Sequence, residues 1–256
     1  MRATVTAILH SLSAAAVGLA ALLPLVGSAR AAEAVTGDAV VELFTSQGCS
    51  SCPPADRVAG ELIKGNGKLI VLSMPVDYWD YLGWKDTFAQ HAFTERQRTY
   101  AKARGDGQVY TPQVVVNGLQ HVVGSEADSI GAAIQSTKAA LEGKRVALKL
   151  VPSADGMTVE IGDAPAGVNV ANAKVILADF KSSADVKIGR GENGGSKVTY
   201  YHVVRELKSI GSWSGKAQTI HLSKADMAKG GSDGCAVILQ SSDGGAILAG
   251  AQLARW

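Results

Sequence analysis

The chain has few cysteines and few aromatic side chains. Of its 256 residues, three are cysteines and 5% are aromatic. Three cysteines are too few for the disulfide framework that holds small secreted domains together. A hydrophobic content of 46% with 19% charged residues is that of an ordinary globular protein and excludes a disordered chain. The length suffices for one large domain or two small ones.

Long apolar runs are also scarce, and the one that is present lies near the N-terminus. Arg2 gives the first residues a positive charge, residues 17–26 are almost wholly apolar, and residues 29–31 read Ala-Arg-Ala. This pattern predicts a secretory signal peptide over residues 1–31. A membrane anchor is the alternative, but the run is shorter than the about 20 residues of a membrane span. We therefore expect a periplasmic or secreted protein with no membrane span after cleavage.

Neither sign of charge is in excess once that segment is set aside. The 25 basic residues of the chain fall to 23 without Arg2 and Arg30, equal to the 23 acidic residues. A chain with no net charge lacks the excess of basic residues that is typical of a nucleic-acid-binding protein. A lone Cys-x-x-Cys excludes a four-cysteine zinc site, and we expect no metal or other cofactor. The remaining histidines have no ligand spacing: His91, His121, His202 and His221.

The most informative stretch is residues 40–56, VVELFTSQGCSSCPPAD. Its first six residues predict a buried strand, Gly48 marks a turn, and the two prolines suit the first turn of a helix. Cys49 and Cys52 are three residues apart at that turn, so their Cα atoms should lie about 5 Å apart, within disulfide range. The positive end of a helix favours thiolate over thiol. The pair is therefore suited to disulfide exchange.

The rest of the chain divides into two parts with different sequence patterns. Residues 38–143 predict the order βαβαββα, with a helix opening at the Thr94–Gln97 capping box and an Asn117-Gly118 hairpin. After Lys144, short β-rich runs alternate with glycine turns, which predicts an antiparallel, sandwich-like β domain over residues 144–256. The fold class is therefore α/β followed by an all-β domain. We expect residues 38–142 to fold without the second domain.

Several other residues have two readings. The aromatic side chains of residues 78–84 are predicted to serve packing, in the core or in an insert, with a peptide groove beside the disulfide as the alternative. The loop GRGENGG, residues 189–195, is predicted to be a β-turn and not a dinucleotide site, because it does not open a helix after a strand. Cys235 begins an apolar strand and is predicted to be a buried thiol.

The strand, the Cys-x-x-Cys, Thr111-Pro112, the Asn-Gly hairpin and the last helix together resemble the thioredoxin superfamily over residues 38–142. The resemblance implies a cis Thr111–Pro112 bond packed against the cysteine pair, and a substrate-binding role for Thr111 and Pro112. The phrases ELFTSQGCSSCPPAD, VDYWDYLGWKD, FTERQR, VYTPQVVVNG, GRGENGG and VVREL are similar to a family of secreted bacterial proteins with a thioredoxin-like core and no assigned function.

The chain also departs from thioredoxins at two positions. Gly48 stands where thioredoxins usually carry tryptophan, and Leu43 where they carry a buried aspartate. Glu42 is the nearest acid, but it is one residue out of step and should point to the other face of the sheet.

These features predict a thiol–disulfide oxidoreductase that acts on protein thiols and disulfides together with a redox partner. Cys49 is expected to be the exposed nucleophile and Cys52 the resolving cysteine. Two alternatives stay open: a copper-binding chaperone that uses the same thiolates, and a non-catalytic binding or assembly module with a structural disulfide. Oxidant, reductant and isomerase differ in redox poise, which Ser50-Ser51 does not fix.

Overall fold

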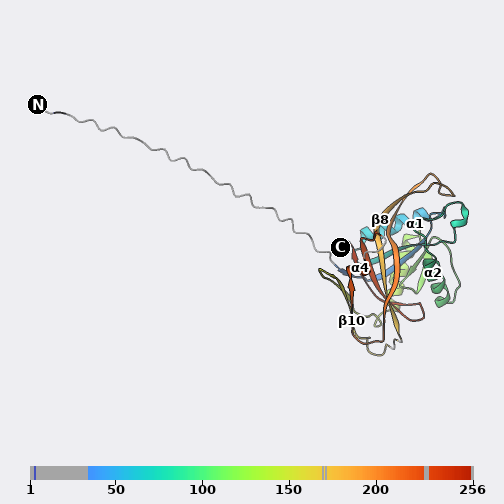
Figure 1. Ribbon diagram of the computed structural model, residues 1–256. Helices are drawn as coiled ribbons and strands as arrows, with labels where there is room; N and C mark the ends of the chain where they lie inside the picture. Colours follow the sequence, from blue (N-terminus) through green and yellow to red (C-terminus); the bar gives the residue numbers. More distant parts are fainter. Residues whose placement is uncertain (1–2, 4–33, 169, 171, 228–230, 255–256) are drawn as a thin grey trace. The chain divides into compact units, whose positions relative to one another are not determined.

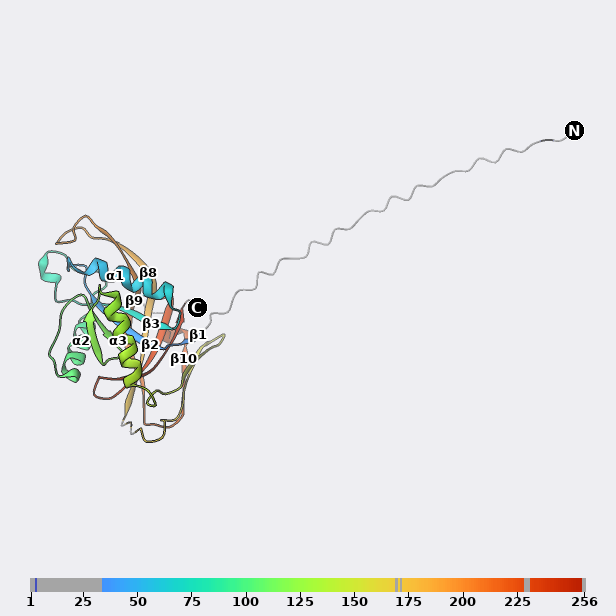
Figure 2. The same cartoon turned by 180° about the vertical axis from the view of Figure 1, so that it is seen from behind.

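The computed structural model describes residues 3, 34–168, 170, 172–227 and 231–254. The predicted signal peptide, residues 1–31, therefore lies outside the described residues apart from residue 3. The described residues from 34 onward form one compact unit, shown from two sides in Figures 1 and 2. None of its described helices is long and apolar enough to cross a membrane.

The predicted order of elements in residues 38–143 is confirmed, after a short first strand. The elements are β1 (Ala34–Thr36), β2 (Ala39–Thr45), α1 (Cys52–Gly65), β3 (Leu69–Pro75), the 3-10 helix η1 (Asp80–Leu82), α2 (His91–Arg104), β4 (Gln113–Val116), β5 (Gln120–Val123) and α3 (Ala127–Ala140).

Two local predictions in this half have different outcomes. The Asn117-Gly118 hairpin is confirmed, because both residues have the positive φ angles, 49° and 70°, that a tight hairpin turn needs. The predicted start of α2 is wrong. The helix begins at His91, and the Thr94 hydroxyl donates to Asp77 Oδ1 (2.6 Å) instead of capping the helix.

Every β-rich run predicted after Lys144 forms a strand. The elements are β6 (Leu148–Pro152), β7 (Gly156–Ile161), β8 (Ala173–Lys187), β9 (Lys197–Trp213), β10 (Gln218–Ser223), the short helix α4 (Lys224–Met227), β11 (Gly234–Gln240) and β12 (Ile247–Ala254).

These strands do not form a domain of their own. The large sheet has the order β1-β12-β11-β8-β9-β3-β2-β4-β5, so it includes strands from both predicted domains. The join is made where β9 runs parallel to β3 at Ser73 and Val203, and the Ser73 hydroxyl donates to the carbonyl of Tyr201 (2.7 Å). The predicted division at residue 143 is corrected for this reason: β9 pairs with the edge of β3 that would otherwise be open.

The two faces of the large sheet are covered differently. In β2, Val41 and Leu43 belong to the core shared with α1 and α3, whereas Val40 and Phe44 belong to the core on the α2 side. Figure 2 shows α3 in front of the strands. The small sheet β10-β7-β6 shares a core with alternate residues of β8, β11 and β12, on the face opposite α2. Both faces of the sheet are therefore buried.

Candidate redox site

The two cysteines of the Cys-x-x-Cys motif form a disulfide at the N-terminus of α1. Their Cα atoms are 5.4 Å apart, and Cys52 is the first residue of the helix. The Cys52 amide donates to the carbonyl of Cys49 (3.1 Å), which closes the turn. The Ser51 hydroxyl lies 3.4 Å from Cys49 Sγ and donates to it, because a disulfide sulfur has no proton. The predicted strand–turn–helix placement is confirmed.

The burial of the pair differs from the prediction. Cys52 is fully buried, but Cys49 is also only 4% exposed, while Ser50 and Ser51 are exposed. The expectation of an exposed Cys49 is therefore wrong for the disulfide form. Two segments far away in the sequence pack around the turn. They are residues 76–88, here called the aromatic segment, and residues 188–196, here called the β8–β9 loop.

Three residues of the aromatic segment form hydrogen bonds with Gln47, which lies two residues before Cys49. The Gln47 amide donates to Asp86 Oδ2 (2.8 Å). Trp84 Nε1 donates to the side-chain oxygen of Gln47 (2.8 Å), and Gln47 Nε2 donates to the Thr87 hydroxyl (3.0 Å). The backbone leading into the disulfide is thus fixed by side chains that follow β3.

Trp79 connects the cysteine turn with the Thr111-Pro112 loop. A Cβ atom added to Gly48 would lie 3.1 Å from Trp79 Cβ and 3.2 Å from its carbonyl oxygen. This close approach explains why a glycine stands immediately before Cys49. The Trp79 indole N–H donates to the Thr111 hydroxyl (2.7 Å). Tyr81 stacks on Trp79 and is 77% exposed. Tyr81 is therefore not a core residue.

The Thr111–Pro112 peptide bond is cis, as the resemblance implies. Pro112 lies at the start of β4, and its carbonyl accepts the Gly124 amide (2.9 Å). A Cβ atom added to Gly124 would lie 3.3 Å from Pro112 Cβ and 3.1 Å from Ala55 Cβ. Ala55 is three residues beyond Cys52, so this loop lies beside the first turn of α1. The substrate-binding role of Thr111 and Pro112 stays a proposal.

A buried carboxyl group, which the sequence analysis missed, lies one helical turn beyond Cys52. Asp56 is 1% exposed and sits four residues after Cys52, on the same face of α1. Asp56 Oδ1 accepts the Thr45 hydroxyl (2.9 Å), and Oδ2 has no hydrogen-bond partner among the described residues. Burial raises the pKa of Asp56 from 3.8 to about 8, although the Thr45 hydroxyl opposes the shift. Asp56 therefore holds a proton at neutral pH. The i, i+4 spacing was its only signal in the sequence.

Asp86 adds a second buried carboxyl to the same region. Burial raises its pKa to about 6, against the amide donors of Gln47 and Phe88. The charge of Asp86 in turn raises the pKa of Asp56. Burial raises the pKa of the Tyr200 phenol from β9, and the two carboxyls raise it further. The two carboxyls and the phenol are thus buried together near the disulfide, and residues from both halves of the sequence supply them.

Glu42 belongs to a different cluster, on the opposite face of the sheet. Its side chain is fully buried and pairs with Arg96 of α2 (2.7 Å). Arg96 also donates to Tyr100 (2.7 Å) and Gln240 (3.0 Å), and Tyr100 donates to Glu42. The prediction that Glu42 points away from the cysteine helix is confirmed. Glu42 fastens α2 to the sheet instead of serving the disulfide.

The third cysteine and the histidines do not join the site. Cys235 is fully buried in β11, which β8 and β9 separate from β3, and burial raises its thiol pKa. Each histidine bonds to a different element: His91 to Asp77, His121 to Tyr110, His202 to the Val71 carbonyl and His221 to Thr158. The described residues contain no group of three or more potential metal ligands.

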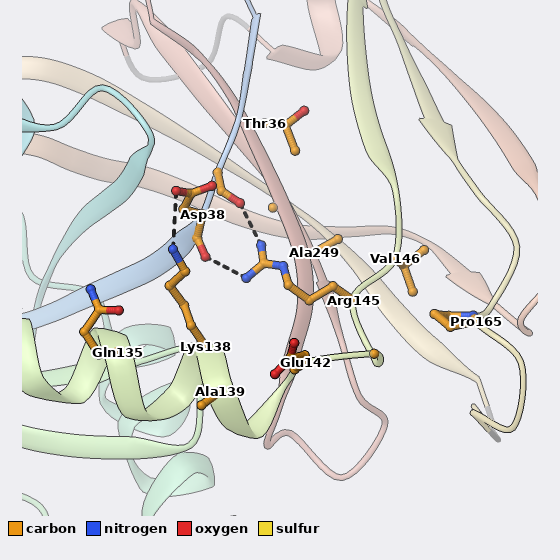
Figure 3. Close-up of a pocket in the computed structure, with 13 residues that line it drawn as sticks. Thr36, Asp38, Gln135, Lys138, Ala139, Glu142, Arg145, Val146, Pro165 and Ala249 are labelled. Carbon is orange, nitrogen blue, oxygen red and sulfur yellow. Dashed lines mark hydrogen bonds and ion pairs between the residues drawn. The ribbon is translucent and has the colours of Figure 1, made fainter.

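A cavity of about 670 Å³ lies at the other end of β2 from the disulfide (Figure 3). Its cationic groups are already engaged. The Arg145 guanidinium donates to the carbonyls of Asp38 (2.6 Å) and Gly37 (2.7 Å), and Lys138 pairs with the Asp38 carboxylate (3.5 Å). These contacts fasten α3 and the segment after it to the start of β2. The cavity therefore contributes nothing to the chemistry of the disulfide.

Comparison with known proteins gives a family and two similar structures. A crystal structure of a structural genomics target from Agrobacterium tumefaciens is 36% identical, with a TM-score of 0.74 over 85% of this chain and 94% of that chain. HBP35 of Porphyromonas gingivalis has a TM-score of 0.54 at 13% identity, over 85% of this chain and 75% of that chain, and so shows likeness of fold alone.

No curated protein sequence matches the chain. Residues 40–240 match the family described as "Protein of unknown function (DUF1223)". That range includes the disulfide turn, the aromatic segment and the β8–β9 loop. The chain belongs to the DUF1223 family.

Proposed function

We propose that this protein is a periplasmic or secreted thiol–disulfide oxidoreductase that acts on protein thiols and disulfides through Cys49 and Cys52. The observation that carries the proposal is the disulfide between Cys49, in the turn before α1, and Cys52, the first residue of α1. Such a position favours thiolates in the reduced state, because the helix N-terminus is positive. A buried proton-holding carboxyl, Asp56, lies one turn away.

The proposed oxidation of two substrate thiols takes place in two steps. A substrate thiolate attacks Cys49 Sγ, the bond to Cys52 Sγ breaks, and the electron pair leaves on Cys52. Asp56 gives its proton to the Cys52 thiolate and becomes a carboxylate, whose Oδ1 accepts the Thr45 hydroxyl. A second substrate thiolate then attacks the substrate sulfur of the mixed disulfide, and Cys49 leaves as a thiolate. The reverse sequence reduces a substrate disulfide, with Asp56 as the proton acceptor.

The arrangement around the site supports a thioredoxin-like core, which we propose as the finer description of this half. The strands lie in the order β3-β2-β4-β5, with β2 and β3 parallel and the β4–β5 hairpin antiparallel. The cysteine turn follows β2, and the cis proline precedes β4. We propose that Thr111 and Pro112 contact the substrate backbone there.

Trapping of mixed disulfides tests the roles of the two cysteines. With Cys52→Ser, the Cys49 thiolate should attack a disulfide-containing protein substrate and stay joined to it as a stable mixed disulfide, while the second substrate sulfur leaves as a thiolate, because no resolving thiol remains. Cys49→Ser should form few, since Cys52 is fully buried. Trapped species are measured by non-reducing electrophoresis and mass spectrometry. Equal trapping by both variants would refute the assignment.

The burial of Cys49 favours one competing function, a non-catalytic module with a structural disulfide. A structural disulfide resists mild reductants, whereas an exchanging pair opens in them. Labelling of thiols after incubation in glutathione buffers separates the two functions. The copper-binding hypothesis stays a prediction, and a copper titration of the reduced protein tests it.

A further inference from the structure

The β8–β9 loop lies directly on the cysteine turn, although it comes from the far part of the sequence. In Figure 1 it is the orange turn at the top of the view. The side-chain nitrogen of Asn193, Nδ2, donates to the backbone carbonyl of Gln47 (3.0 Å) and to that of Cys49 (2.8 Å). Asn193 is only 8% exposed. The carboxylate of Glu192 accepts the amide of Ser50 (3.3 Å).

The loop is itself held in place, so it can act as a fixed support. Its base packs against the aromatic segment in a cluster that contains Ile188, Tyr200, Trp84 and Phe88. Backbone hydrogen bonds close its turn, from Gly194 to Gly191 and from Ser196 to Asn193. Asn193 therefore presents its amide group to the cysteine turn from a packed base.

We infer that Asn193 is a positioning residue of the redox site, which fixes the backbone of Cys49 so that its sulfur stays in place to pair with Cys52. The inference rests on the proposed function. Residues 47–49 lie between β2 and α1 and depend on outside groups. The Asp86 carboxylate accepts the Gln47 backbone amide, and the Asn193 side chain donates to the carbonyls of Gln47 and Cys49.

Positioning of this kind stabilises the closed disulfide relative to the dithiol. Two glutathione molecules reduce the disulfide to two thiols and are themselves oxidised to one glutathione disulfide. Without Asn193 the reduced turn gains conformational freedom, which must be lost again when the bond closes. We expect Asn193→Ala to raise the equilibrium constant for reduction by about five- to tenfold, the effect of losing roughly one net hydrogen bond.

The experiment compares whole proteins in glutathione buffers of graded ratio, with quantitative thiol labelling as the readout. Arg190→Ala is the matched control, because Arg190 is an exposed residue of the same loop with no hydrogen bond or ion pair to the turn. Thermal unfolding of each oxidised variant is measured in parallel. An equilibrium shift in Asn193→Ala but not in Arg190→Ala, with both proteins folded, supports the inference.

Three results would overturn the inference and leave the proposed function standing, and a fourth would overturn both. The first is a folded Asn193→Ala protein with the wild-type equilibrium constant, and the second is an equal shift in Arg190→Ala. If Asn193→Ala does not fold, Glu192→Ala decides: its equilibrium constant should exceed that of Arg190→Ala by about twofold, and equal values refute the support by the loop. A wild-type disulfide that stays closed in every buffer would remove the exchange function as well.

Discussion

Asp56→Asn should make the protein more stable at neutral pH and slower in disulfide exchange. Asn has nearly the shape of a protonated aspartic acid, and its side-chain oxygen can still accept the Thr45 hydroxyl, now 2.9 Å from Asp56 Oδ1. The substitution removes the ionisable proton and leaves the hydrogen bond from β2. It therefore separates the cost of burying an acid from the chemistry that the acid performs.

The sign of the stability effect follows from the two pKa values. In the folded protein the pKa of Asp56 is about 8, above the ordinary value of 3.8 that it has in the unfolded chain. Between these values the folded state keeps a proton that the unfolded state has lost, so stability falls as pH rises. Each pH unit in this window costs about 1.4 kcal/mol. The cost is absent below about pH 4 and reaches about 4 kcal/mol at pH 7, as an upper estimate.

Urea unfolding of the oxidised proteins at pH 4, 5, 6 and 7 measures the effect. The free energy of unfolding of Asp56→Asn minus that of the wild type should be near zero at pH 4 and should grow by up to about 1.4 kcal/mol per pH unit. The matched control is Asp155→Asn, because Asp155 is exposed in the turn between β6 and β7. Its difference from the wild type should not change with pH.

The exchange rate completes the test. Reduction of a protein disulfide by the dithiol form should slow by about a hundredfold in Asp56→Asn, the lower end of the range for loss of a general acid–base group. Parallel stability curves for the variant and the wild type would refute the raised pKa. Unchanged exchange rates over the same pH range would refute the proton transfer to Cys52.

Two further predictions concern an exposed aromatic residue of the site and the folding of residues 38–143 without β9. Tyr81→Ala, at an exposed residue that stacks on Trp79, should leave the unfolding free energy within about 0.5 kcal/mol of the wild type and the rate of reduction by dithiothreitol unchanged. It should raise KM for a cysteine-containing peptide about threefold through loss of an aromatic contact, and an unchanged KM would contradict a substrate contact. A fragment of residues 38–143 should aggregate or stay unfolded, because it exposes the edge of β3 that β9 covers. Circular dichroism and gel filtration that show a folded monomer would contradict this expectation.

The part of the site that could be predicted from the sequence is the part built from neighbouring residues. Val40–Thr45, Gly48 and the two prolines define a strand, a turn and a helix start, and the spacing of Cys49 and Cys52 then allows a disulfide. The Asn117-Gly118 turn needed no distant contact either, because its positive φ angles are a local property. The strands after Lys144 were located in the same way, from short alternating runs.

The environment of the disulfide could not be predicted in this way. Asn193 reaches the carbonyl of Cys49 from 144 residues away, and Asp86 reaches the Gln47 amide from 39 residues away. These contacts bury Cys49, which the sequence predicted to be exposed. The spacing of Asp56 from Cys52 was visible, but its burial and raised pKa come from the packing of α1 against β2 and β9.

The sequence by itself determined most of the secondary structure elements, the cysteine pair and the face of β2 to which Glu42 points, because these depend on backbone geometry over a few residues. Only the tertiary structure decided that β9 joins β3, so that the predicted second domain extends the first sheet and its β8–β9 loop covers the disulfide. The reason is physical. The open edge of a strand can pair with any strand of suitable length, and the choice depends on the packing of all layers at once.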